Sequence, residues 1–75
     1  MEETETLELL FDFLKEYTNN NRRLIVGILN PLKTEIMQKE MYNYLIENRS
    51  NPEMMTNDVL LEKTLAIAGV FPNGW

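Results

Sequence analysis

Residues 30–49 read NPLKTEIMQKEMYNYLIENR, and we predict that they form the central helix of the fold. Asn30 can accept a hydrogen bond from a free N–H group of the first turn, which makes it a good helix cap. Pro31 fits the first helical position, because the N–H group that proline lacks would have no partner there. The sequence therefore predicts a helix over residues 31–48.

The predicted central helix is apolar on two sides. On a helical wheel with about 100° per residue, its apolar residues form two groups that face in roughly opposite directions. One group is Met37, Met41, Tyr44 and Leu45, and the other is Leu32, Ile36, Tyr42 and Ile46. A surface helix usually has one apolar stripe, so this helix needs cover on both sides, from its own chain or from a second chain. Ile36, Tyr42 and Ile46 are therefore candidate contacts with a partner.

An amphipathic helix is predicted over residues 5–17. Its apolar face repeats at three- and four-residue intervals and consists of Leu7, Leu10, Phe11, Leu14 and Tyr17. Leu9 and Phe13 lie beside this face, and they are either core residues or the border of a contact surface. The opposite side is charged, at Glu5, Glu8, Asp12, Lys15 and Glu16. The Asn-rich residues 18–21 then predict a loop, since asparagine tolerates left-handed backbone conformations.

Residues 22–29 read RRLIVGIL, a short apolar run that suits either a strand or a buried helix. A strand needs a second strand to pair with, and the only comparable run, residues 65–71, contains glycine and ends before a proline. We therefore predict a short helix over residues 21–29. It should break at Asn30, because a residue before proline avoids helical geometry.

Two more helical segments are predicted after the central helix. The Asn-Pro pair at residues 51–52 predicts one helical turn over residues 52–55. A final helix is predicted over residues 57–68, with Gly69 in the left-handed position that often follows a helix. The plainly polar residues between Val59 and Ala68 are only Glu62, Lys63 and Thr64, so we expect this helix to be the most buried.

These patterns predict an all-α fold in a single domain that spans residues 1–75. Its three main helices cover residues 5–17, 31–48 and 57–68, and its two short helical segments cover residues 21–29 and 52–55. A chain of this length buries only about 60% of the surface that its unfolded form exposes. Because its stability should be marginal, self-association into a homodimer is one expected way to add to it.

The composition excludes several kinds of chemistry. The chain has no cysteine and no histidine, so it lacks zinc or iron–sulfur ligands, a cysteine nucleophile and a histidine-based triad. Its three glycines are far apart in the sequence, which excludes a glycine-rich phosphate loop. We predict no enzymatic activity, no cofactor, no bound metal and no small-molecule substrate.

The sequence also predicts a location and a kind of source. It contains no run of eighteen apolar residues, and its N-terminus is acidic where a signal peptide would be basic and then apolar. Together with the absence of cysteine, this favours the cytoplasm. Nine asparagines against two alanines favour an AT-rich coding sequence, such as that of a low-GC bacterium or one of its phages.

The net charge of −5 is concentrated near the N-terminus, where residues 1–18 alone carry −5. A negative field opposes binding to nucleic acids and anionic membranes, and it favours a basic protein partner. The candidate charge contacts are Glu5, Asp12 and Glu16 in the first helix, and the concentrated basic pair Arg22 and Arg23.

We interpret the chain as a non-catalytic module that binds another protein or itself, such as a small bacterial or phage regulator or inhibitor. More apolar surface is present than three short helices can readily hide, and exposed apolar area marks an interface. The candidate partner-binding residues are Leu9, Phe13, Ile36, Tyr42, Ile46 and Trp75. Trp75 either packs back on the bundle or forms a hot spot for a partner.

An alternative interpretation is a small DNA-binding regulator of the helix-turn-helix type. It would use Arg22 and Arg23 together with the central helix to contact phosphates. Against it, the basic residues of the central helix are interspersed with Glu35, Glu40 and Glu47, which repel phosphate.

Overall fold

The computed structural model describes the backbone of residues 2–70 and the side chains of residues 5–69. Throughout this part of the chain the regular secondary structure is helical, which confirms the predicted all-α fold. The elements are α1 (Glu2–Tyr17), α2 (Arg22–Leu29), α3 (Glu35–Asn48), the 3₁₀ turn η1 (Pro52–Met54) and α4 (Asn57–Val70). The short apolar run after the first loop is therefore a helix. Trp75 lies outside the described residues.

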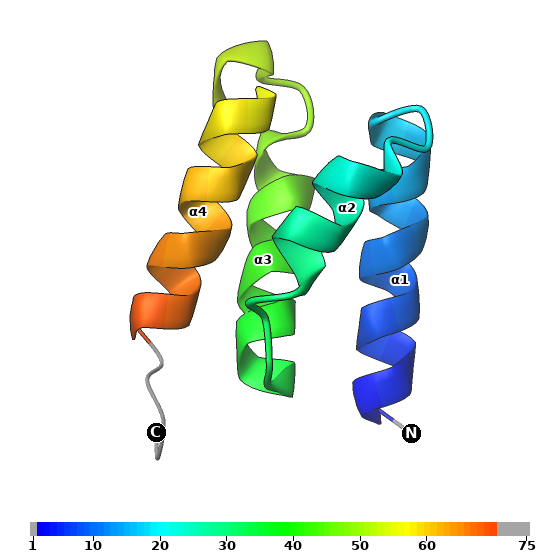
Figure 1. Ribbon diagram of the computed structural model, residues 1–75, viewed down its shortest axis with the longest axis vertical. Coiled ribbons are helices and arrows are strands. Elements are labelled where there is room, and N and C mark those ends of the chain that lie inside the picture. Colours follow the sequence, from blue (N-terminus) through cyan, green and yellow to red (C-terminus); the bar gives the residue numbers. More distant parts are fainter. Residues whose placement is uncertain (1, 71–75) are drawn as a thin grey trace.

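The helix α3 lies between α1 and α4 in the bundle (Figure 1). The helices α1 and α3 run in the same direction, and α4 runs back along α3 in the opposite one (Figure 1). The short helix α2 runs obliquely and packs against both α1 and α4. The helices α1 and α4 of the same chain thus cover α3 in part, while Ile36 of its second apolar group stays 53% exposed.

Each of the four α-helices contributes fully buried apolar side chains to one core. These side chains are Leu10 and Leu14 of α1, Ile28 of α2, Met41 and Leu45 of α3, and Leu60 of α4. The connector after η1 adds Met55, which is also buried. Burying such side chains is the main favourable term in the folding of a domain of this size.

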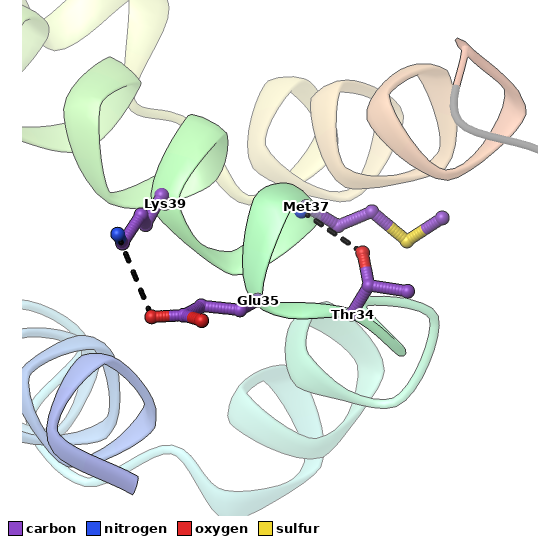
Figure 2. Close-up of polar contacts among 4 residues, drawn as sticks. All are labelled: Thr34, Glu35, Met37 and Lys39. Atoms are coloured by element: carbon purple, nitrogen blue, oxygen red, sulfur yellow. Dashed lines mark hydrogen bonds and ion pairs between the residues drawn. The ribbon is translucent and has the colours of Figure 1, made fainter. Parts of the chain in front are cut away.

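The start of α3 differs from the prediction. Asn30 has helical dihedral angles (φ −57°, ψ −43°), and its N–H group donates to the carbonyl of Val26 at 2.8 Å. It therefore ends α2 and does not cap the next helix. Thr34 has the extended geometry that a cap needs, and its Oγ1 accepts a hydrogen bond from the N–H group of Met37 at 3.2 Å (Figure 2). The central helix begins at Glu35, four residues later than Pro31.

The two possible caps can be distinguished by mutation. Thr34→Ala removes the acceptor for the Met37 N–H group, and we expect it to lower the free energy of unfolding by about 1 kcal/mol. Asn30→Ala is the matched control, and it should change that free energy by less than about 0.5 kcal/mol. Urea unfolding followed by circular dichroism measures both. A larger loss in Asn30→Ala than in Thr34→Ala would contradict this assignment.

The loop between α1 and α2 has the backbone geometry that its asparagines favour. Asn19 and Asn20 have φ angles of 60° and 63°, in the left-handed region that asparagine tolerates better than most residues. Asn21 then caps α2, because its side-chain oxygen accepts from the N–H group of Leu24 at 3.2 Å. The loop sets the angle at which α2 crosses back over α1.

The burial of α4 also differs from the prediction that it is the most buried helix. Thr64, one of the three plainly polar residues of this helix, is fully buried, and its hydroxyl donates to the carbonyl of Ile28 at 2.7 Å. Leu65 is 61% exposed, so α4 is not buried all round. The helix α2 approaches this side of α4 closely, since a Cβ atom on Gly27 would lie 3.2 Å from Cδ2 of Leu61.

Gly69 does not end the last helix, contrary to the prediction. Its φ angle lies outside the left-handed region, and α4 continues to Val70. Glycine permits the left-handed conformation without requiring it, so its presence alone does not terminate a helix.

The turn η1 is tied to α3 by the side chain of Tyr44. Its hydroxyl donates to the carbonyl of Met54 at 2.7 Å, and the Nζ atom of Lys63 lies 5.0 Å from the centre of its ring. Partial burial raises the pKa of the Tyr44 phenol above its ordinary value of 10.0. The phenol therefore stays protonated, and able to donate, at neutral pH.

Candidate functional site

Three exposed carboxylates form a line along α1. Glu5, Asp12 and Glu16 are separated by seven and four residues, which is about two turns and one turn of helix, so they share one side of α1. All three are exposed. We call these residues the acidic stripe.

Two apolar residues border the acidic stripe on the same helix. Leu9 is 53% exposed, and Phe13 is half-buried, packs against the core and stacks on the ring of Tyr17 with 6.0 Å between ring centres. They are four residues apart and therefore stand one above the other. The sequence left open whether they are core residues or a surface border; Phe13 is partly in the core, and Leu9 is at the surface.

The helix α3 supplies the other side of this site. Phe13, Glu16 and Tyr17 line a hollow of about 400 Å³ together with Arg49 and Ser50, which follow α3. The helices α1 and α3 pack together and run in the same direction (Figure 1), and we infer that the side of α3 that leads to Arg49 continues this surface one and two turns earlier.

Those preceding residues of α3 are Ile46 and Tyr42, three and seven positions before Arg49. Both are half-buried, and Tyr42 packs against the core. We call the whole surface the α1/α3 flank, and it comprises Glu5, Leu9, Asp12, Phe13 and Glu16 of α1, and Tyr42, Ile46 and Arg49 beside them. Seven of these eight residues were predicted from the sequence as partner or charge contacts; Arg49 was not.

The charges of the α1/α3 flank are free to meet a partner. Among the side chains of residues 5–69, the ion pair formed is that of Glu35 with Lys39, at 3.5 Å and near the start of α3 (Figure 2). The carboxylates of the acidic stripe and the guanidinium of Arg49 are outside that pair. Exposed charges of this kind contribute little to stability, but they steer a charged partner toward the surface.

The remaining predicted contacts lie elsewhere. Ile36 is exposed on α3, but it precedes Ile46 by ten residues, which is about 15 Å along the helix. Arg22 and Arg23 are exposed at the start of α2, and Arg22 lines a second hollow with Phe11 and Lys15. Trp75 lies outside the described residues. The basic pair therefore does not join the acidic stripe, and its use in DNA binding stays a prediction.

Sequence reasoning missed three exposed apolar side chains on α1 and α2. Leu7 and Phe11 were assigned to the apolar face of the first helix, but they are 40% and 42% exposed, and Val26 of α2 is 60% exposed. The buried line of α1 runs through Leu10 and Leu14 instead. Phe11 precedes Lys15 by four residues and therefore borders the charged side of α1, which could have indicated that its side chain is exposed.

The described part of the chain also lacks other kinds of site. Among residues 5–69, acidic side chains do not come together in a group of three that could hold a metal ion. Within residues 2–70, none of the helices is both long enough and apolar enough to cross a membrane. Comparison with protein-family models, with curated proteins and with solved structures finds no significant match.

Proposed function

We propose that this chain is a non-catalytic protein-binding module that recognises its partner through the α1/α3 flank. The observation that carries the proposal is the position of the acidic stripe directly beside exposed Leu9 and the hollow at Phe13 and Arg49. A protein interface combines an apolar centre, which supplies affinity, with a charged rim, which supplies orientation. The flank offers both within three turns of one helix.

The chemistry of the flank indicates what a partner should present. The three carboxylates of the acidic stripe need basic residues opposite them, arranged along a line of about 16 Å to match eleven residues of helix. An apolar side chain beside those basic residues would enter the hollow against Phe13. Arg49 at the far side of the hollow would pair with one acidic group of the same partner.

The arrangement of the carboxylates favours binding over catalysis. Catalytic acids and bases converge on one reacting atom in a cleft. Neighbouring carboxylates of the acidic stripe are about 6 Å and 10 Å apart along the helix axis, and all three residues are exposed. This spacing suits contacts with several basic residues along an extended partner surface.

Leu9→Lys tests the proposal because it places a charge at the centre of the flank without touching the fully buried core. We expect the purified, tagged chain to retain a specific protein from a lysate of its source organism. For that protein, once purified, Leu9→Lys should weaken binding about tenfold or more, since apolar residues at the centre of an interface carry most of its affinity. Isothermal titration calorimetry measures the two affinities.

Leu65→Lys is the matched control, because Leu65 is similarly exposed but lies on α4. It should bind the protein as the unchanged chain does. The triple variant Glu5→Lys, Asp12→Lys, Glu16→Lys should bind more weakly and should lose most of the salt dependence of binding. Equal binding by Leu9→Lys and Leu65→Lys would show that the partner does not bind through the α1/α3 flank.

A further inference from the structure

A second exposed apolar surface lies where α1 meets α2. Leu7 and Phe11 are exposed one turn apart on α1, and exposed Val26 of α2 shares with Phe11 a hollow of about 270 Å³. Phe11 is two residues from both Leu9 and Phe13, which places it about 160° around α1 from them. This surface is therefore separate from the α1/α3 flank.

Charges of opposite sign stand at the two ends of this surface. Glu8 and Lys15 are both exposed on α1 and are seven residues apart, so they share one side of the helix, and Phe11 lies midway between them. Lys15 places its Nζ atom 5.4 Å from the centre of the Phe11 ring, and Arg22 lines the same hollow. We call this surface the α1/α2 face, and it comprises Leu7, Glu8, Phe11, Lys15, Arg22 and Val26.

We propose that the α1/α2 face binds a second copy of this chain, with the two α1 helices antiparallel about a twofold axis near Phe11. A twofold axis there reverses the direction of the partner helix. Glu8 of each copy then meets Lys15 of the other, and Leu7 and Phe11 of each copy enter the hollow of the other. In such an interface the same patch serves both subunits.

The order of the charges is what selects a second copy as the occupant. Along α1 the face contains Leu7, Glu8, Phe11 and Lys15 in that order, so its acidic and basic residues lie on opposite sides of Phe11, and it is complementary to a surface with the reverse order of charges. Its own twofold image has that order, whereas a parallel copy would set Glu8 against Glu8 and Lys15 against Lys15, which is repulsive. The exposed apolar side chains supply surface to bury, and the charged residues on either side of Phe11 fix the register.

Two single charge reversals test this geometry without disturbing the core. Sedimentation equilibrium of the unchanged chain should show the average mass rising from 8.9 kDa toward twice that value with concentration. Glu8→Lys and Lys15→Glu each replace two attractive contacts with two repulsive ones, so each should raise the dimer dissociation constant on the order of tenfold. An equimolar mixture of the two variants should associate as tightly as the unchanged chain, because every 8–15 contact in the mixed dimer is again between opposite charges.

Sedimentation equilibrium of a control variant also tests the α1/α2 face. Glu47→Lys makes an equal charge change at an exposed position of α3, outside the α1/α2 face, and should leave the dissociation constant within about twofold. A monomer at all concentrations would overturn the proposal. So would a mixture of Glu8→Lys and Lys15→Glu that associates no better than either variant alone, or a dimer that Leu9→Lys abolishes. The first two contrary outcomes do not bear on binding of another protein to the α1/α3 flank, whereas a dimer that Leu9→Lys abolishes would place the second copy on that flank.

Discussion

Leu60→Ala is expected to lower the free energy of unfolding by about 3 kcal/mol. Leu60 is fully buried near the start of α4 and belongs to the single core cluster. Truncation to alanine removes three carbon atoms from a close-packed interior and leaves a cavity that its neighbours fill only in part. A domain of 75 residues has a total stability of roughly 4–11 kcal/mol, so this one change should remove a large share of it.

Leu65→Ala is the matched control on the same helix. Leu65 follows Leu60 by five residues but is 61% exposed, so the same truncation should cost less than about 0.5 kcal/mol. Urea unfolding, followed by circular dichroism, measures the free energy of unfolding of both variants and of the unchanged chain. Similar costs at the two positions would show that α4 is rotated from the orientation described above. A large cost at Leu65 alone would indicate that this residue packs against a second chain.

The secondary structure could be predicted from the sequence because local signals agree with the tertiary structure. The alternation of apolar and charged residues over residues 5–17 is a local property, and α1 covers that range. The helix boundaries were less predictable where two signals compete. Asn30-Pro31 and Thr34-Glu35 both suit the start of a helix, and the choice depends on how far α2 continues, which the hydrogen bond from Asn30 to Val26 decides.

The α1/α3 flank could be predicted in large part for the same reason. Positions seven and four apart on one helix must share a side, so the acidic stripe follows from the sequence once α1 is assigned. The contribution of α3 depends on which side of α1 it packs against. That choice arises from long-range packing, and no periodicity within either helix reveals that Arg49 lies beside Phe13.

The α1/α2 face could not be predicted, because a helical wheel does not show where a neighbour stops covering an apolar side. Leu7 and Phe11 are as apolar as Leu10 and Leu14, but they are 40% and 42% exposed, whereas Leu10 and Leu14 are fully buried. The same limit applied to α4, where the sequence indicated an apolar helix but did not give the rotation that buries Thr64 and exposes Leu65.

Thr64→Val is expected to lower the free energy of unfolding by about 2 kcal/mol, although valine has nearly the shape of threonine and is more apolar. The reason lies at the end of α2. In a continued helix, the N–H group of Leu32 would donate to the carbonyl of Ile28, but it donates to the carbonyl of Leu29 at 3.0 Å. The Thr64 hydroxyl, fully buried and 2.7 Å away, donates to the Ile28 carbonyl in its place.

Thr64→Ser separates the hydrogen bond from the packing. Serine keeps the hydroxyl and loses one methyl group, which should cost about 1 kcal/mol, less than the loss of the buried hydrogen bond in Thr64→Val. Both values come from urea unfolding. If Thr64→Val is as stable as the unchanged chain, the contact with Ile28 does not hold α4 against α2. If Thr64→Val is the less stable of the two variants, one hydroxyl on α4 completes the end of a helix 36 residues earlier in the sequence, and this explains why a polar residue belongs in the core.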